Sequence, residues 1–181
     1  RARPKVLLAQ DVAGAERIIQ EHGRYLLGVI SDAKIPEQRD GAEVDGAGLR
    51  LMKRVRSLRP ELPIMVQSSD ASKAEDSQAI GASFVDKNSP LLYQHMREFM
   101  LLQFGFGPFV FRNPNGSVEA TAGTIRELEE AVHGVTDECI LFHGTQNHFS
   151  TWLRARTEFE LADRLAPKKV ADFSGARGMR S

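Results

Sequence analysis

Short apolar runs alternate with amphipathic segments through the first half of the chain. Three of these runs are typical of buried strands because they are short and largely apolar: Leu26–Ile30, Leu62–Val66 and Ala82–Val85. Segments with a helical period separate them. This alternation of strand and helix predicts an α/β fold in which helices cover both faces of a parallel sheet.

A polar residue whose side chain can take part in a reaction follows each apolar run. Asp32, Ser68 and Lys87 stand just after the three predicted strands. Ligands collect beyond the carboxyl ends of the strands in open sheets of this kind, so we expect the three side chains to converge. A carboxylate there can act as a nucleophile towards a phosphoryl donor. A lysine and a hydroxyl can then hold the phosphate oxygens.

Each of these residues also has an ordinary structural interpretation. Asp32 can be a turn or N-cap residue, Ser68 can cap the following helix, and Lys87 can be a solvated loop charge. Their order along the chain and their common place at strand ends favour a shared site.

The same residues resemble the receiver domain of bacterial response regulators, with Ile35-Pro36 following Asp32. The resemblance implies a flavodoxin-like sheet and an Asp32 that accepts phosphate from a histidine kinase or another phosphodonor. It also implies that Ser68 is the switch hydroxyl, Phe84 the switch aromatic residue and Lys87 the phosphate-binding lysine. Asp32 is, by the same resemblance, a ligand of Mg²⁺.

The segment before Asp32 is shorter than the resemblance requires. It predicts one strand, Lys5–Ala9, and one helix, Val12–His22, with Asp11 as the N-cap. Receivers have two such steps, so the first strand, the first helix and the acidic pair that binds Mg²⁺ are expected to lie upstream, outside an incomplete chain, and Mg²⁺ binding to need those acids. Val6–Ala9 should then not pair directly with Leu27–Ile30; upstream residues or a neighbouring chain should fill the gap, because unpaired strand edges are costly.

The loop after Pro36 is longer than the family pattern. Residues 37–44 precede Asp45-Gly46, which resembles the family's usual helix start. A tolerated surface insertion is slightly favoured over a cover for the Asp32 site.

The chain changes character after a helix predicted over Ser89–Gln103. We expect a receiver-like domain over residues 1–104 and a small α+β module over residues 105–181, with Gly105 and Gly107 as a hinge. The module should contain a β-hairpin and three helices, one of them long with i,i+4 ion pairs Arg156/Glu160 and Glu160/Arg164. The elements expected are Phe109–Arg112, Ser117–Ala120, Ile125–Val132, Asp137–His143 and Phe149–Leu165. A capping box, Thr124-Ile125-Arg126-Glu127, opens the first of these helices.

The module offers no convincing metal or nucleophile site. His143 and His148 do not share a helical face, and no further ligands complete a zinc set, so a hydrogen-bonded pair at a helix junction is favoured. Cys139 lies in an apolar context, and neither a nucleophile elbow nor a phosphate-binding Gly-rich loop occurs. No cofactor other than Mg²⁺ is expected.

Composition narrows the setting only moderately. Lys plus Arg and Asp plus Glu both number 24, so charge gives no reason to expect nucleic-acid or membrane binding. The basic run 53–59 is expected to form a solvated helix face. A single cysteine, no signal peptide and no long apolar run predict a soluble cytoplasmic protein.

A second resemblance rests on five runs, of which the last is the most specific: Ile30–Asp32, Gln67–Ser69, Asp86–Pro90, Phe104–Gly107 and Asn147–Phe159. With these runs, nearly the whole chain resembles the signalling region of bacterial phosphoenolpyruvate synthase-related proteins of the pyruvate phosphate dikinase type. The resemblance implies a receiver module that regulates other domains of the same polypeptide, with no independent catalytic activity here and a homodimer as one assembly. The alternative is a pseudo-receiver for structure or docking, in which a resident cation such as Lys34 pairs permanently with Asp32.

Overall fold

The structure is a computed structural model that describes residues 4–181. The described chain divides into two compact units, one extending to Phe99 and the other comprising Met100–Ser181. We refer to them as unit 1 and unit 2. The division falls within helix α4 (Leu92–Leu102), ahead of the boundary expected at residue 104.

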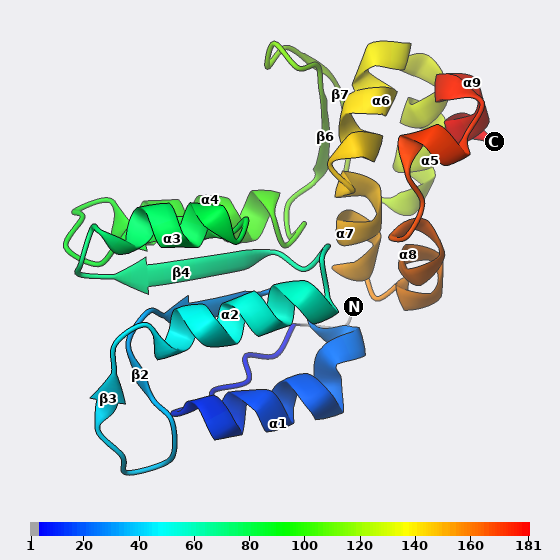
Figure 1. The fold of residues 1–181 in the computed structure, drawn as a ribbon. Helices are drawn as coiled ribbons and strands as arrows, with labels where there is room; N and C mark the ends of the chain where they lie inside the picture. Colours follow the sequence, from blue (N-terminus) through cyan, green and yellow to red (C-terminus); the bar gives the residue numbers. More distant parts are fainter. Residues whose placement is uncertain (1–3) are drawn as a thin grey trace. The chain divides into compact units, whose positions relative to one another are not determined.

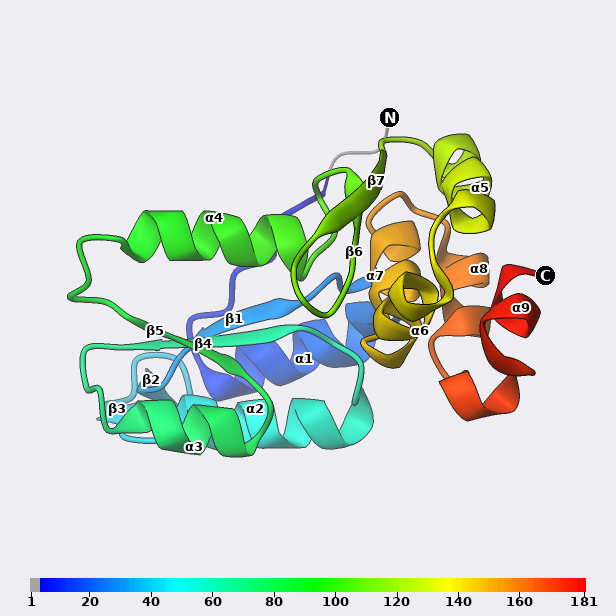
Figure 2. The ribbon, with the colours of Figure 1, turned by 90° about the horizontal axis from the view of Figure 1, so that it is seen from above.

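Unit 1 contains a three-stranded parallel sheet. Its strands are β1 (Val29–Asp32), β4 (Ile64–Ser68) and β5 (Ser83–Asp86), in the order β1-β4-β5. The middle strand is the β4 arrow of Figure 1, and all three strands are labelled in Figure 2. The predicted α/β class with a parallel sheet is confirmed. Each strand begins slightly later than its apolar run and includes the polar residue that follows it, because the backbone ladder continues after the buried side chains end.

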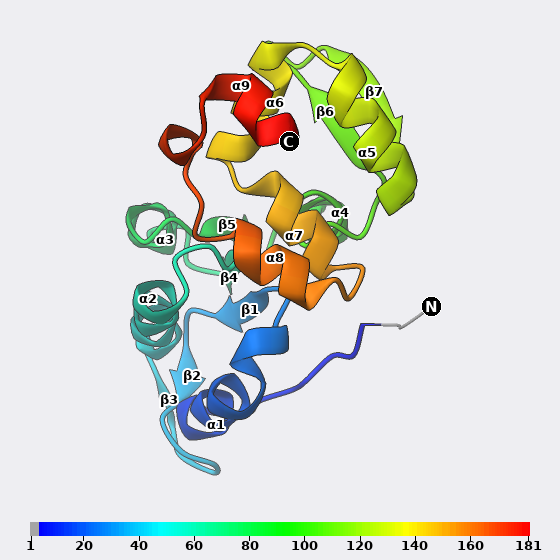
Figure 3. The same ribbon diagram turned by 90° about the vertical axis from the view of Figure 1, so that its right-hand side faces the viewer.

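Helices cover the two faces of this sheet unequally. Figures 2 and 3 show α2 (Ala47–Leu58) and α3 (Lys73–Ala79) on one face and α4 on the opposite face. Helix α1 (Val12–His22) lies on the α2 side, because its apolar residues belong to the same buried cluster. That cluster includes Val12, Ala15, Ile19, Leu51, Met52, Val55, Ile64 and Val66. The main core of unit 1 is therefore one-sided.

Asp11 has the capping role that its position predicts. Its side chain accepts a hydrogen bond of 2.6 Å from the backbone N–H of Gly14 at the start of α1. A carboxylate at this place accepts a hydrogen bond from a backbone N–H that the helix itself leaves unpaired. The positive end of the helix dipole also stabilises its negative charge. A short 3₁₀ turn, η1 (Gly23–Tyr25), follows α1 and leads to β1.

The strand predicted over Lys5–Ala9 is wrong, since these residues form no regular structure. Val6 and Leu8 are each 84 % exposed. A strand-like sequence forms a strand only where a neighbouring edge completes its hydrogen bonds. Strand β1 pairs with β4, and no other strand among residues 4–181 pairs with it. The prediction of a filled gap between two strands is not tested, because Val6–Ala9 forms no strand.

The long loop after Pro36 is a small hairpin. Strands β2 (Ile35–Pro36) and β3 (Glu43–Val44) pair antiparallel. Glu37 attaches this hairpin to the helices: its carboxylate binds Arg50 of α2 at 2.6 Å, and its carbonyl accepts the N–H of Ala13 in α1 at 3.2 Å.

Unit 2 opens with the predicted hairpin, formed by β6 (Phe109–Arg112) and β7 (Val118–Ala122). Helix α5 (Ile125–Gly134) begins with the predicted cap, in which Thr124 accepts the N–H of Glu127 at 3.2 Å. Glu127 reaches back to the N–H of Gly123 at 2.7 Å. Helix α6 (Asp137–Thr145) follows, two residues longer at its end than expected.

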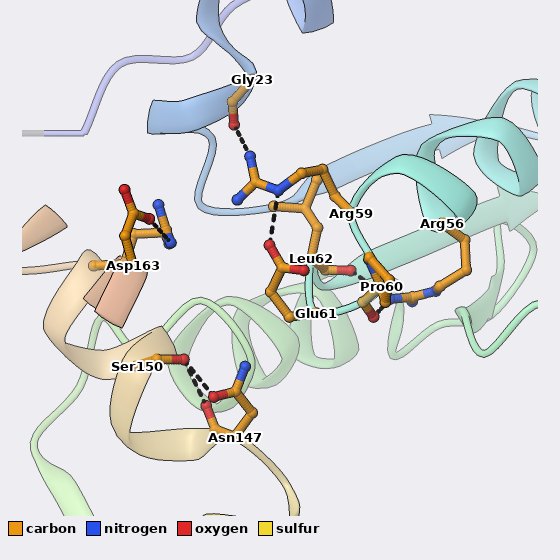
Figure 4. Close-up of polar contacts among 10 residues, drawn as sticks. Gly23, Arg56, Arg59, Pro60, Glu61, Leu62, Asn147, Ser150 and Asp163 are labelled. Carbon is orange, nitrogen blue, oxygen red and sulfur yellow. Dashed lines mark hydrogen bonds and ion pairs between the residues drawn. The ribbon is translucent and has the colours of Figure 1, made fainter. Parts of the chain in front are cut away.

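The single long helix predicted over Phe149–Leu165 is wrong. Two short helices replace it, α7 (His148–Arg154) and α8 (Phe159–Leu165). Thr157 between them has φ 66°, a left-handed conformation that ends a right-handed helix. Arg156 and Glu160 lie on opposite sides of this break, so the i,i+4 pair expected between them loses its basis, whereas Glu160 and Arg164 both lie on α8. Arg154 of α7 pairs with Asp163 of α8 at 2.5 Å, and Asp163 is labelled in Figure 4.

Arg156 fastens the segment that was expected to act as a hinge. Its guanidinium donates to the carbonyls of Gly105 and Gly107, each at 2.9 Å, and stacks 3.3 Å from the centre of the Trp152 ring. Gly105 has φ 70°, and a Cβ there would come within 2.9 Å of the Trp152 Cα. Within unit 2 this glycine segment is thus held at several points.

Two further elements close unit 2, the 3₁₀ turn η2 (Val170–Asp172) and helix α9 (Gly175–Arg180), which the sequence pattern did not predict. Arg180 binds the carbonyls of Val132 and Val135 at the end of α5. No helix within residues 4–181 is both long and apolar enough to cross a bilayer.

Candidate functional site

The parallel register places the three predicted site residues at one edge of the sheet. Asp32 is the last residue of β1 and Ser68 the last of β4, while Lys87 directly follows β5. The ladder continues past the strand ends: Ala33 donates to the carbonyl of Gln67 at 3.0 Å, and Lys87 donates to the carbonyl of Ser68 at 2.9 Å. Backbone pairing alone therefore brings the three strand ends together.

Asp32 and Lys87 form a direct ion pair. The Lys87 Nζ lies 2.8 Å from Oδ2 of Asp32, and each side chain is 36 % exposed. The predicted convergence of these two residues is confirmed. The half-exposed setting leaves the pair reachable from solvent, and it keeps their attraction modest because water screens it.

The second carboxylate oxygen of Asp32 has a different environment. Oδ1 is shielded from solvent and has no hydrogen-bond partner among residues 4–181. Buried carboxylate oxygens are normally bonded, since an unbonded one keeps the cost of losing water. Asp32 thus has one oxygen held by an ammonium group and one oxygen without a protein donor.

Ser68 stands at the same edge of the sheet, where its backbone carbonyl accepts the N–H of Lys87. Its Oγ accepts the N–H of Asp70 at 3.1 Å, which uses one acceptor position and leaves the hydroxyl proton for another partner. Its strand register places it opposite Asp86, next to Lys87. Phe84 lies opposite Val66 in the same sheet and is partly buried.

The loop that carries Lys87 is fixed by its neighbours. Asp86 accepts the N–H of Asn88 at 2.8 Å, and the Asn88 side chain donates to the carbonyl of Ser69 at 3.1 Å. These bonds tie the loop after β5 to the loop after β4. Asn88 is thus a positioning residue that the sequence argument missed, although Asp-x-Asn is a turn signal.

Gly48 is a second residue that the sequence argument missed. A Cβ at this position would lie 1.8 Å from the carbonyl oxygen of Asp32, closer than any real contact. The N–H of Gly48 donates to the carbonyl of Ala33 at 3.1 Å. The start of α2 therefore packs directly on the backbone of the phosphoacceptor candidate, and only glycine fits there.

Lys34 does not supply the resident cation that was hypothesised for Asp32. Its Nζ lies 3.4 Å from Glu43 of the β2–β3 hairpin, and both side chains are well exposed. Residues two apart would share a side in a regular strand, but the chain bends at Ala33 and Lys34 between β1 and β2. Lys87 is the cation that pairs with Asp32.

The predicted Mg²⁺ site is not completed by the described residues. Mg²⁺ takes an octahedral set of oxygen ligands. No group of three or more His, Cys, Asp or Glu side chains within residues 4–181 is placed to hold a metal ion. The unpartnered Oδ1 of Asp32 offers one ligand, whereas Asp11 is used as a helix cap. The donor set found here does not by itself fit Mg²⁺.

The basic run 53–59 is only partly the solvated face that was expected. Arg56 donates to the carbonyls of Ile80 and Gly81 at 3.1 and 2.8 Å, and to those of Pro60 and Leu62 at 2.5 and 2.9 Å. Burial lowers the pKa of its guanidinium. This side chain joins the end of α2 to the starts of β4 and β5.

Arg59 has a similar structural role (Figure 4). It donates to the carbonyl of Gly23 at 2.5 Å and to the carboxylate of Glu61 at 2.7 Å. Lys53 and Arg54 of the same helix are exposed, in agreement with a solvated face. The run therefore offers no free basic patch that would suit a polyanion.

Cys139 is unsuited to nucleophilic chemistry. Its side chain is buried, and burial raises the pKa of the thiol to about 11. A thiol with such a pKa is protonated at neutral pH and reacts slowly.

Comparison with family models, curated proteins and solved structures finds no match for this chain. The geometry around Asp32 therefore carries the functional conclusion.

Proposed function

We propose that this chain is a receiver-like signalling module in which Asp32 accepts a phosphoryl group. The observation that carries the proposal is the Asp32 carboxylate itself. One of its oxygens pairs with Lys87 at 2.8 Å, and the other has no donor among residues 4–181, at the carboxyl edge of a parallel sheet. A receiver fold that lacks its first strand agrees with the β1-β4-β5 order and with the single neighbour of β1.

The chemistry assigned to the site is a phosphoryl transfer. An oxygen of the Asp32 carboxylate attacks the phosphorus of a phosphohistidine or a small acyl phosphate. A new oxygen–phosphorus bond forms, and the bond between phosphorus and the donor breaks, with its electron pair leaving on the donor. The ammonium group of Lys87 offsets the charge that arrives, and the Ser68 hydroxyl donates to a phosphoryl oxygen.

The switch in this proposal begins with a change of partner at Lys87. In the described state its ammonium group binds Asp32. A phosphoryl group on Asp32 provides new oxygens for Lys87 to bind, and Ser68 moves towards these oxygens. Phe84, on the neighbouring strand, changes its position in response. Such charge-driven movements at a local site are how phosphate switches work in general.

A pseudo-receiver is the second candidate. It is favoured by the ion pair, since Lys87 already satisfies part of the charge on Asp32, and by the incomplete donor set for Mg²⁺. In this case Asp32 holds the loop after β5 in place and never becomes phosphorylated. The module then serves as a docking or structural part of a larger polypeptide.

Beryllofluoride binding separates these candidates. The polypeptide as its gene encodes it is titrated with beryllofluoride and Mg²⁺ and followed by fluorine NMR, because the adduct mimics a phosphoryl group on a carboxylate. We expect a bound signal that Asp32→Asn abolishes and that Asp86→Asn retains, since Asp86 is a matched carboxylate at the end of β5. In the chain of residues 1–181 alone the signal should be weak. Retention of the signal in Asp32→Asn, or its absence in the folded full polypeptide, supports the pseudo-receiver.

The wider role is proposed from sequence resemblance. The run Asn147–Phe159 supports a place beside the phosphoenolpyruvate synthase-related signalling proteins. In that setting a histidine kinase or another phosphodonor acts on Asp32, and the output passes to other domains of the same polypeptide.

A further inference from the structure

Two histidines in unit 2 form a hydrogen-bonded pair inside an aromatic cluster. His143 of α6 is buried, and its Nδ1 lies 2.9 Å from Nδ1 of His148, the first residue of α7. The other nitrogen of His143, Nε2, accepts the backbone N–H of Arg112 in β6 at 2.8 Å. One chain of bonds thus connects β6, α6 and α7.

The backbone donor fixes where every proton in this chain of bonds lies. A backbone N–H can only donate, so Nε2 of His143 carries no proton and the ring proton is on Nδ1. That proton occupies the space between the two Nδ1 atoms. Nδ1 of His148 is therefore an acceptor, and the proton of His148 lies on its Nε2.

Neither ring can take up a proton without breaking a bond. Protonating His148 places a second proton in the 2.9 Å space between the Nδ1 atoms. Protonating His143 places a proton on Nε2, opposite the N–H of Arg112. The same arrangement opposes a metal ion on Nδ1 of His143, because a neutral metal-bound imidazole would carry its proton on Nε2.

The surroundings add no charge that would stabilise an imidazolium. Phe109, Phe142 and Phe149 have ring centres within 4.8 to 5.9 Å of His143. Burial lowers the pKa of His143 to about 4, with the positive charges of a protonated His148 and of Arg112 acting in the same direction. Burial also lowers the pKa of His148.

Among the described residues, the other titratable groups on the packed elements are neutral, bound elsewhere or, like Glu138 of α6, exposed to solvent. Cys139 stands one turn before His143 on α6, and its thiol is protonated at neutral pH. Glu119 of β7 accepts from Thr136 at 2.5 Å. Arg180 of α9 pairs with Asp137, and Asp163 of α8 pairs with Arg154.

We propose that His143 and His148 form an acid-sensitive latch, which holds α7 against β6 and α6 only while both imidazoles are neutral. His148 is the point of proton entry, because its side chain is partly exposed whereas that of His143 is buried. Breaking the latch frees the start of α7 and the aromatic rings packed beside it. Phe149, the next residue of α7, stacks on Phe109 of β6 with ring centres 5.0 Å apart.

The direction of the pH effect follows from the lowered pKa values. In the unfolded chain both histidines titrate near 6.5, so the unfolded state binds more protons as pH falls below that value. The stability supplied by the pair is fully present above about pH 6.5 and is lost as pH falls towards about 4. Within this window the unfolding constant of unit 2 should rise about tenfold per pH unit for each proton taken up.

Trp152 makes the latch measurable, because it is the only tryptophan, lies on α7 and is buried. The unfolding constant is obtained from urea titrations of the whole chain followed by Trp152 fluorescence, from about pH 8 to about pH 5. The double variant His143→Gln/His148→Asn keeps the order of donors and acceptors without a titrating group. We expect the pH dependence in the natural chain and in His133→Gln, an exposed control, and its loss in the double variant.

Ring nitrogen NMR on the natural chain provides a test that needs no variant. At about pH 8 we expect the proton on Nδ1 of His143 and on Nε2 of His148, and no titration of His143 near 6.5 in the folded state. The proposal is overturned if the proton of His143 is found on Nε2, or if both rings titrate near 6.5 while α7 stays packed. An unchanged pH dependence in the double variant overturns it as well.

Discussion

Units 1 and 2 place their ionisable groups in opposite settings. In unit 1 Asp32 and Lys87 meet at the edge of a sheet, each about one third exposed, and one oxygen of Asp32 has no protein donor among the described residues. In unit 2 the histidines lie among aromatic rings, with each proton between His143, His148 and Arg112 assigned to a protein acceptor. The first arrangement leaves capacity for a ligand, whereas the second uses its capacity to hold helices together.

The difference shows how burial separates chemistry from architecture. A charged group that reacts with a solute must remain accessible to water. Its ionised form then carries only a small desolvation cost. A polar group in a closed core is stable only when neutral or fully bonded. Unit 1 meets the first condition at Asp32, and unit 2 meets the second at His143.

The largest loss of stability is expected on substitution of Gly48. This change should destabilise unit 1 and leave unit 2 unaffected. Gly48→Ala places a Cβ 1.8 Å from the carbonyl of Asp32. We expect a loss of more than about 3 kcal/mol in the stability of unit 1, measured by urea unfolding with far-ultraviolet circular dichroism. Gly23→Ala is the matched control, since no atom lies within 4 Å of its Cβ. Equal stability of the two variants contradicts the close approach of α2 to β1.

Arg56 sharpens the comparison, because it is a partly buried cation of unit 1 that is bound by backbone carbonyls. Arg56→Met leaves four carbonyls without their donor, and we expect a loss of about 2 kcal/mol. Arg54→Met on the same helix removes an exposed pair with Glu16 and should cost less than about 1 kcal/mol. Similar urea midpoints for the two variants would show that Arg56 does not bridge α2, β4 and β5.

The smallest effect on stability should be at Lys34. Its pair with Glu43 is exposed on both sides, so Lys34→Ala should change the unfolding free energy by less than about 0.5 kcal/mol. Beryllofluoride binding should also be unchanged, whereas Lys87→Ala should weaken it at least about tenfold, because Lys87 and not Lys34 pairs with the Asp32 carboxylate. Weaker beryllofluoride binding in Lys34→Ala would instead indicate that Lys34 is the resident cation of Asp32.

The sequence patterns correctly predicted those elements that depend on residues close together along the chain. The apolar runs located the strands, and the parallel register then required Asp32 and Lys87 to share an edge. Asp11 and Thr124 were identified as caps because their hydrogen bonds reach only three residues along the chain.

The misses come from contacts between distant residues. Lys5–Ala9 has the composition of a strand but finds no neighbouring edge among the described residues. The predicted helix 149–165 breaks where Thr157 turns and Arg156 binds the carbonyls of Gly105 and Gly107. The β2–β3 hairpin escaped notice because each of its strands has two residues, too few for a visible alternation.

The most direct test of the central claim is to locate a phosphoryl group after exposure to acetyl phosphate and Mg²⁺. The full polypeptide is treated, the acyl phosphate is trapped by borohydride reduction, and the modified residue is identified by peptide mass spectrometry. The receiver proposal predicts modification at Asp32, lost in Asp32→Asn and retained in Asp86→Asn. An unmodified Asp32 in a folded polypeptide, or modification at another carboxylate, contradicts it.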